Sequence, residues 1–440
     1  MMNIINKLNF YLTIFVITVN SLLFLITLNL NAFNFNYSIQ YYQILYFLIP
    51  IEIIMYIYKI IKKEIKFTYY DMIVLSILIL LIIVTNNSID INTSIWGAYG
   101  RNEGLLCILS YYLLFLNSKD LDKKQIITII KVFFGTGIVQ FIYCLLQVFV
   151  RLPGIKLFSL NGSNYMAMGF VGNPNFLGSY CIMILCLALM LYFIKKEKKY
   201  FWLSIIFFIN LILAQSTGSF FAFLILFPFM IVFMKIKNII DWKKVGIVFI
   251  SFMLTFIVVS NGIELYCQKV FNDKIVSSYT IKGDILNTLN LFGISKGNDE
   301  GNVTIEDYGS GRITIWKNAL KIVPKYFWLG SGIDTFGYVY RNGGHVYYDK
   351  AHNEYLQILI TEGIFSLILY LGLLLTLFVD GIKSNSKLVW VLMMAFVGYA
   401  LQAFLNIRVN TVAPMFYIIM GIMVGLISQE KVKGKSKKVA

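Results

Sequence analysis

The sequence predicts an all-α, polytopic integral membrane protein with about 12 transmembrane helices and one large extracytoplasmic loop. Of its 440 residues, 58% are hydrophobic and 14% are charged, and the mean hydropathy is +0.74, which is more apolar than a soluble globular chain of this length. Apolar stretches of roughly 17–25 residues recur along the chain, which is the length needed to cross about 30 Å of hydrocarbon. Basic residues gather between these stretches, as they do in membrane proteins of defined orientation.

Each apolar stretch gives one predicted span, although the fourth and seventh are short. The predicted spans are 9–32, 41–61, 69–86, 104–117, 126–150, 176–194, 200–214, 218–234, 245–262, 353–379, 388–405 and 411–428. They divide the chain into a first membrane part over 1–262, a loop over 263–352, and a second membrane part with a basic tail over 353–440. We expect these parts to form a single functional domain.

The basic clusters predict the orientation. They lie at 62–66, 119–124, 195–199, 235–244, 383–387 and 431–438. Twelve spans place all of these clusters on one side, which the positive-inside rule identifies as cytoplasmic. The sequence therefore predicts a multi-pass protein of the cell membrane with both termini in the cytoplasm. The net charge of +16 is explained by this topology and by the lipid bilayer, so we expect no nucleic acid as a partner.

The loop 263–352 holds most of the unusual polar sequence on the opposite, outer side. A polar, glycine-rich tract at 293–311 is followed by apolar residues at helical spacing, with Ser310 as a candidate N-cap and Pro324 at the end of the pattern. These apolar residues are Ile313, Trp316, Leu320 and Val323. They predict an amphipathic helix on the membrane surface or on top of the spans.

Two residues of this outer side are candidates for chemistry. Arg312 lies in the first turn of the predicted amphipathic helix, where a guanidinium and a helix N-terminus together suit a diphosphate or a carboxylate. His352 is placed at the N-cap if the next span begins near Asn353, and the positive helix end favours a neutral imidazole that can accept a proton from a hydroxyl. An ordinary solvated arginine and a structural histidine are the respective alternatives.

Other polar residues have two interpretations each. Arg101 and Glu103 could pair with each other or hold substrate. Asn173 and Asn175 flank Pro174 in a turn that could line a donor site. Asp334 could bind substrate or serve as a turn residue.

The sequence offers no metal site on the outer side. Asp120-Leu121-Asp122 lies in a lysine-rich cluster that is predicted to be cytoplasmic, and we interpret it as a solvated loop. The cysteines Cys107, Cys144, Cys181 and Cys186 lie in apolar spans, so they cannot join Cys267 in a zinc quartet or a disulfide framework. We therefore expect neither a metal nor another cofactor.

Several motifs resemble those of the O-antigen ligase and polymerase family of membrane glycosyltransferases. In "AHNEYLQILITEGIFSLILYL" (351–371), His352-Asn353 are separated from Gly363 by nine residues, which is the family's spacing, and Ser366 stands where the family usually has Gly, Thr or Tyr. "SGRITIWKNALKIVPKYFWLGSGIDTFGYVY" (310–340) is similar to the family's Ser-Gly-Arg-x-x-x-Trp helix and Gly-x-Gly turn. "GRNEGLL" (100–106) and "GNPNFLGSY" (172–180) are similar to further landmarks, so that the resemblance covers roughly 95–430.

The resemblance implies a GT-C-like fold and a metal-independent transfer of a glycan. The donor would be an undecaprenyl-diphosphate-linked oligosaccharide, and the acceptor would be a hydroxyl of a glycan, lipid or protein at the outer face. It implies His352 as the catalytic residue. The substrate-binding candidates are Arg312, Arg101, Arg151, Asn353, Asp334, Asn173 and Asn175. Many ligases have an arginine where this chain has Thr217, so either Arg101 or Arg151 compensates or the donor is held differently.

A transporter of polysaccharide or lipid-linked oligosaccharide, of the flippase kind, is the alternative, because such proteins also often have about twelve spans. Transporters usually show internal repeats and interrupted helices with polar midplane sites. This sequence shows no clear sign of either, and its polar residues gather in one asymmetric insertion. The pattern favours an enzyme, and the kind of acceptor stays open among polymerase, lipid ligase and protein glycan transferase.

Overall fold

The computed structural model describes residues 2–32, 41–62, 67–149, 166–271, 281, 312–343 and 348–439. Every regular element within these ranges is a helix, which confirms the predicted all-α class. Contacts divide the chain into two compact units, one of Met1–Val132 with Ser310–Ala440 and the other of Phe133–Gly309.

The described helices fit a polytopic membrane protein. Nine of those in the described ranges are long and apolar enough to cross a membrane, judged by length and composition. Two further apolar helices, Leu105–Ser118 and Lys387–Ala403, are shorter. The count of about 12 spans stays a prediction, and within the predicted loop 263–352 the residues 272–280, 282–311 and 344–347 lie outside the described ranges.

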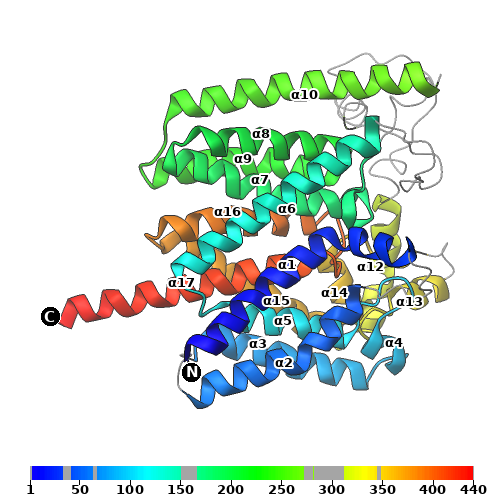
Figure 1. The fold of residues 1–440 in the computed structure, drawn as a ribbon. Coiled ribbons are helices and arrows are strands. Elements are labelled where there is room, and N and C mark those ends of the chain that lie inside the picture. Colours follow the sequence, from blue (N-terminus) through cyan, green and yellow to red (C-terminus); the bar gives the residue numbers. More distant parts are fainter. Residues whose placement is uncertain are drawn as a thin grey trace. The chain divides into compact units, whose positions relative to one another are not determined.

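The first unit is a bundle of long helices (Figure 1). They are α1 (Met2–Ala32), α2 (Tyr41–Ile61), α3 (Tyr69–Asn86), α5 (Leu105–Ser118), α15 (Gly363–Lys383), α16 (Lys387–Ala403) and α17 (Ala413–Val439). The short helix α5 packs against α2 and α17 and is buried from Ser110 through Ser118. Small residues allow α17 to approach it, since a Cβ at Gly421 or Gly425 would meet the backbone carbonyls of Phe115 and Lys119.

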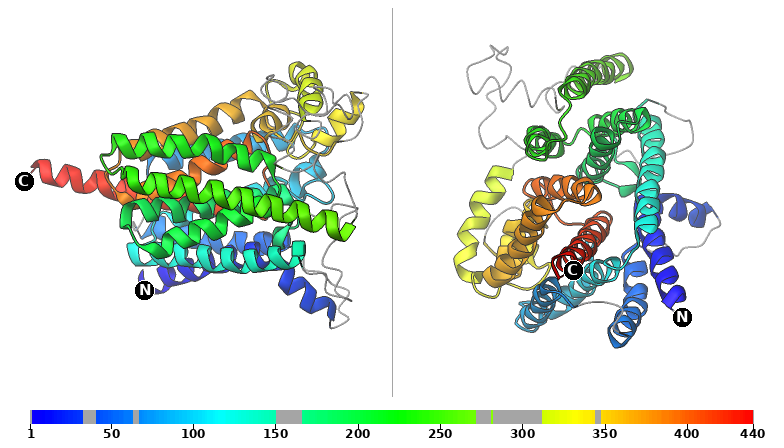
Figure 2. Two further views of the ribbon diagram at one scale, coloured as in Figure 1. Left: turned by 90° about the horizontal axis from the view of Figure 1, so that it is seen from above. Right: turned by 90° about the vertical axis from the view of Figure 1, so that its left-hand side faces the viewer.

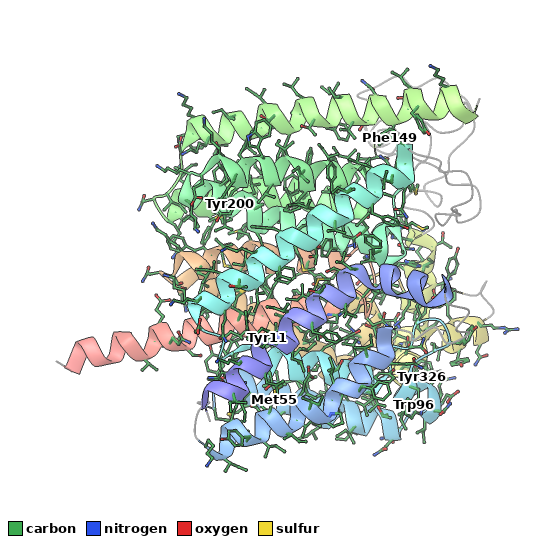
Figure 3. All side chains as sticks on the ribbon, viewed as in Figure 1. Tyr11, Met55, Trp96, Phe149, Tyr200 and Tyr326 are labelled. Carbon is green, nitrogen blue, oxygen red and sulfur yellow. The ribbon has the colours of Figure 1, made fainter. Side chains whose placement is uncertain are left out.

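Short elements gather at one end of the first unit, opposite the end where both termini lie (Figures 1 and 2). They are α4 (Ile91–Trp96), α12 (Arg312–Tyr326), α13 (Phe336–Asn342) and α14 (Glu354–Thr361). Figure 3 labels Trp96 and Tyr326 at this end. A small apolar core holds the short helices together. Its buried members are Ile315, Ala319, Ile322, Phe336, Val339, Tyr340, Ala351 and Ile360.

The helix α12 is the predicted amphipathic helix, with a different buried face. Ile315, Ala319 and Ile322 are its buried residues, whereas Leu320, which we expected on the apolar face, is 58% exposed. The helix also continues past Pro324 to Tyr326. Packing against α13 and α14 therefore selects a face that the spacing of the large apolar residues alone does not identify.

The predicted single span 353–379 is wrong, because the helix is interrupted. α14 ends at Thr361, and α15 begins at Gly363, whose φ is +82°. The turn at 330–332 docks on this break: the amides of Ser331 and Gly332 each donate, at 2.9 Å, to the carbonyls of Ile360 and Thr361. The last carbonyls of α14 thus find partners outside the helix, which makes the interruption stable.

The second unit contains most of α6 (Lys123–Phe149), a short 3₁₀ turn at Gly169–Val171, and four further helices. These are α7 (Pro174–Lys195), α8 (Lys198–Leu213), α9 (Thr217–Ile236) and α10 (Trp242–Phe271). α7 is buried from Leu177 through Phe193 and packs against α8 and α9. Three of the cysteines predicted in apolar spans lie buried and free in this unit, and Cys107 does so in the first unit.

Candidate active site

The candidate site lies at the end of the first unit that carries the short helices. Three segments contribute to it: the loop 97–104 between α4 and α5, the turn 348–353 before α14, and the first turn of α12. The charges of Arg312, Asp349 and Arg101 all act on the imidazole of His352, so these four residues form one electrostatic group. The structure therefore brings together three of the residues predicted from the sequence and adds Asp349.

His352 precedes the N-cap of α14 and does not occupy it, which corrects the predicted placement. Asn353 is the N-cap, and its side-chain oxygen accepts from the amide of Leu356 at 3.0 Å. His352 itself has a φ of +51°, a left-handed conformation that is uncommon for residues other than glycine. The preceding Ala351 is fixed on both sides, by Trp316 Nε1 donating to its carbonyl at 3.0 Å and by Gln357 Oε1 accepting from its amide at 2.8 Å.

The side chain of His352 is held in its neutral form. Burial lowers the pKa of the imidazole to about 4, the cations Arg312 and Arg101 act in the same direction, and the Asp349 carboxylate opposes them. At neutral pH the ring is therefore unprotonated and can accept a proton. The sequence left the protonation state open and offered only the helix end in favour of the neutral form, whereas in the structure burial and two arginines lower the pKa.

Arg101 forms an ion pair with Asp349 at the surface of the site. The side chains are 28% and 27% exposed, so water reaches both. Burial by itself would raise the pKa of the Asp349 carboxyl, but the hydrogen bond and charge of Arg101 outweigh burial and hold that pKa below its ordinary value. The backbone of Arg101 is anchored by Asn410, whose Nδ2 donates to the Arg101 carbonyl at 2.9 Å.

A buried charge network lies beneath this surface pair. It consists of Glu103, Asp334, Lys350, Glu362 and Arg408. Lys350 Nζ lies 2.9 Å from Glu103 Oε2 and 2.6 Å from Asp334 Oδ1. Arg408 lies 3.3 Å from Glu103 through its Nε and 2.9 Å from Glu362 through an Nη atom. Burial opposes a charged lysine, but the two carboxylates outweigh it and raise the pKa of Lys350 above its ordinary value.

The buried charge network shows the partners of several residues whose roles the sequence left open. Glu103 pairs with Lys350 and Arg408, and Arg101 pairs with Asp349, which does not favour the alternative in which Arg101 and Glu103 pair with each other. Glu362 is buried and pairs with Arg408. Asp334 is 3% exposed, and its Oδ2 also accepts from the amide of Ala98 at 2.7 Å, which favours the structural interpretation of this residue over substrate binding.

The remaining candidates belong to the second unit or lie outside the residues that the structure describes. Asn173 is the N-cap of α7, with its Oδ1 accepting from the amide of Asn175 at 2.8 Å, and Asn175 Oδ1 accepts from Ser216 Oγ at 2.9 Å. Both asparagines belong to the second unit, as does Thr217 at the start of α9. Arg151 and the candidate N-cap Ser310 lie outside the described residues.

Asp349, Lys350 and Arg408 were not predicted from the sequence. For Arg408 a signal existed, because it is the only charged residue in 388–429. A lone cation in so long an apolar stretch is expected to find a buried counter-charge. For Asp349 and Lys350, proximity to His352 in the chain is the only signal, and it does not reveal that their partners lie near residue 100.

The carboxylates near Asp120 have structural partners. Asp120 pairs with Lys59, and Asp122 Oδ1 accepts from the amides of Lys124 and Gln125 at the start of α6. They follow the end of α5, whereas Arg101 and Glu103 precede its start, which separates the two places by about 20 Å. Among the residues that the structure describes, no group of histidine, cysteine, aspartate and glutamate side chains could hold a metal ion.

A family model matches part of the chain. Residues 201–371 match the family model described as O-antigen ligase, and a search of the curated proteins finds no match. The matched segment includes Arg312, the turn 348–353 and Gly363, which are residues on which the sequence resemblance rests. The match supports membership of the O-antigen ligase family, and at the level of that family it supports a glycosyltransferase activity.

Proposed function

Taking membership of the O-antigen ligase family as the premise, we propose that this protein is a membrane glycosyltransferase that transfers or polymerises glycan from an undecaprenyl-diphosphate-linked donor. The acceptor is a hydroxyl at the extracytoplasmic face. The observation that carries the proposal is the group formed by a neutral His352 with Arg312, Arg101 and Asp349 at one end of the first unit.

The proposed reaction assigns a role to each member of this group. The acceptor hydroxyl gives its proton to the neutral imidazole of His352 as its oxygen attacks the anomeric carbon of the donor sugar. The bond from that carbon to the diphosphate oxygen breaks, and the diphosphate leaves with the electron pair. Arg312 and Arg101 stabilise the negative charge that collects on the leaving diphosphate, as guanidinium groups do for phosphates. This chemistry requires no metal.

The arrangement of the first unit supports the proposed orientation. The site and both chain termini lie at opposite ends of this unit (Figures 1 and 2). The tail 431–438 is rich in lysine, and the positive-inside rule assigns such a segment to the cytoplasm. With the tail and the N-terminus in the cytoplasm, the site faces the extracytoplasmic side, where lipid-linked oligosaccharide donors are used.

The test is a reconstituted reaction. Purified protein in liposomes, supplied with an undecaprenyl-diphosphate-linked repeat unit, should release undecaprenyl diphosphate and form a longer glycan or a glycosylated acceptor, identified by mass. The mass distinguishes a polymerase from a lipid ligase and from a protein glycan transferase. Activity should persist in a metal chelator.

An arginine variant tests the role assigned to the guanidinium. Arg312→Lys should lose most activity, because an ammonium keeps the charge but not the two-pronged geometry that binds two phosphate oxygens. Arg341→Lys is the matched control, since Arg341 is an exposed arginine at the end of α13.

Movement of the lipid-linked glycan across the bilayer without formation of a new glycosidic bond would establish the transporter alternative instead.

A further inference from the structure

Two neighbouring ion pairs join the turn 348–353 to the loop 97–104, and they differ in burial. Lys350 pairs with Glu103, and their side chains are 4% and 2% exposed. Arg101 pairs with Asp349, and their side chains are 28% and 27% exposed. The same two segments are thus connected once in the interior and once at the surface.

The two pairs differ in whether a ligand can replace them. Separating Lys350 from Glu103 would break the buried charge network and leave Lys350 with Asp334 alone and Glu103 with Arg408 alone, which is unfavourable for charges in the interior. Separating Arg101 from Asp349 leaves both groups in contact with water, where an ion pair contributes little to stability. The buried pair therefore keeps the segments together, and the surface pair can open without loss of the fold.

The two charges of the surface pair also act on the imidazole of His352, and they act in opposite directions. Arg101 and Arg312 act on the imidazole as cations, and Asp349 acts on it as an anion. Asp349 is consequently the negative charge that accompanies the two arginines. An incoming diphosphate would present the same sign of charge, on oxygens suited to the same guanidinium.

We propose that Asp349 is a specificity-determining residue that pairs with Arg101 until the diphosphate of the donor displaces it from that arginine. The proposal rests on the proposed function, because it names the residue that the donor must displace. A weakly binding anion cannot replace the attached carboxylate, whereas a diphosphate, which carries more charge and more acceptor oxygens, can. The exchange leaves the Asp349 carboxylate beside His352, where it favours the imidazolium that forms as the hydroxyl gives up its proton.

A set of charge variants tests the exchange. The dissociation constant of undecaprenyl diphosphate should fall about two- to fivefold in Asp349→Asn, the range that a partly exposed ion pair supports. It should rise in Arg101→Gln. The double variant should bind like Arg101→Gln alone, since the carboxylate acts only through that arginine. In turnover, Asp349→Asn should lower KM and also lower kcat, a split that a purely structural role would not produce.

Asp241→Asn is the matched control. Asp241 pairs with Lys244 at 3.1 Å, and its side chain is 29% exposed, so the variant removes a comparable carboxylate from a comparable ion pair in the second unit. Its affinity for undecaprenyl diphosphate should be unchanged. Asp349→Ser removes the same charge with a different shape and replaces the asparagine variant if that variant does not accumulate.

The outcomes separate this proposal from the proposed function. Unchanged or weaker binding by folded Asp349→Asn, or a gain in binding that persists when Arg101 is also replaced, would overturn the exchange. If binding follows the expected pattern but the wild-type protein forms no glycosidic bond, the exchange stands and the glycosyltransferase proposal fails. If the wild-type protein transfers glycan and the variants show no gain, only the exchange fails.

Discussion

At the scale of single residues, His352 joins an uncommon backbone conformation to a neutral side chain. Its left-handed φ is fixed by its neighbours, because Ala351 is hydrogen-bonded on both sides and Asn353 caps the following helix. The helix cap is therefore supplied by Asn353, and a structural role for His352 as the cap is excluded. The imidazole is positioned by a backbone that does not depend on it.

Replacing His352 tests its catalytic role. His352→Ala should fold, insert and bind donor, yet transfer glycan at least about a hundredfold more slowly, because general-base assistance typically contributes 10²- to 10⁴-fold. The measurement is kcat at saturating donor, with folded protein quantified in parallel. His345→Ala, which removes the chain's other histidine, is the control and should remain active. Near-normal transfer by His352→Ala would disprove the catalytic assignment.

The pKa of His352 predicts the pH dependence of the reaction. Since burial and two arginines lower this pKa to about 4 in the free protein, the imidazole stays a base down to that pH, and kcat/KM should decline only as the pH approaches 4. The bound diphosphate is an anion that favours the protonated ring, so the acidic decline of kcat should lie at higher pH than that of kcat/KM.

Paired pH profiles measure this difference directly. Initial rates at low and at saturating donor, from about pH 3 to pH 8, give the two declines separately. A decline of kcat/KM centred near the ordinary histidine pKa of about 6.5 would contradict the neutral, buried imidazole. In Asp349→Asn the decline of kcat/KM should move to still lower pH, since the carboxylate raises the pKa of the ring.

At the scale of elements, the interruption between α14 and α15 depends on glycine. Gly363 has a φ of +82°, and a Cβ there would collide with the backbone of Trp328. Gly363→Ala should therefore destabilise the protein by about 1–3 kcal/mol, the usual range for a strained backbone position. Thermal unfolding in detergent measures the loss.

Gly372→Ala is the control for this substitution. Gly372 lies in the same helix, and a Cβ there would meet nothing within 4 Å. Alanine is favoured over glycine in helices by about 1 kcal/mol, so this variant should be as stable as the wild type or more stable. Equal stability of the two alanine variants would show that the interruption tolerates a side chain.

The long helices could be predicted from the sequence, whereas the interruption between α14 and α15 could not. Long apolar stretches predict helices because each must satisfy its own backbone in lipid. The interruption at Gly363 is not predictable in this way, since its partners are the amides of Ser331 and Gly332, and a glycine in an apolar run is also compatible with a continuous helix. Leu320 illustrates the same limit, because the buried face of α12 is selected by the helices that pack on it.

Some residues of the candidate site could likewise be predicted from the sequence, and others could not. His352 and Arg312 were predicted because each lies at a recognisable place near a helix start and within a motif. The partners Asp349 and Lys350 were not predicted, because an ion pair between residues separated by about 250 positions leaves no local pattern. Charge in an apolar surrounding is the signal that sequence reasoning can use, and Arg408 is the residue where it applies.

At the scale of the whole molecule, the orientation is open to a direct test. In a background without native cysteines, a single cysteine at position 197 should react with a thiol reagent only from the cytoplasmic side, and one at position 300 only from the outer side, because basic clusters are retained in the cytoplasm. Labelling of intact and permeabilised cells distinguishes the two. Reaction of both positions from the same side would refute the predicted topology.

The ion pairs of the first unit also bear on how the chain can be recombined. Asp349, Lys350 and Glu362 lie inside the segment 201–371 that matches the family, whereas their partners Arg101, Glu103 and Arg408 lie outside it on both flanks. A chimera that exchanged only the matched segment with a relative would separate charges that complete one another and would leave some of them buried alone. The residues that have to be exchanged together therefore extend beyond 201–371 on both sides, and a working chimera has to include both flanking regions.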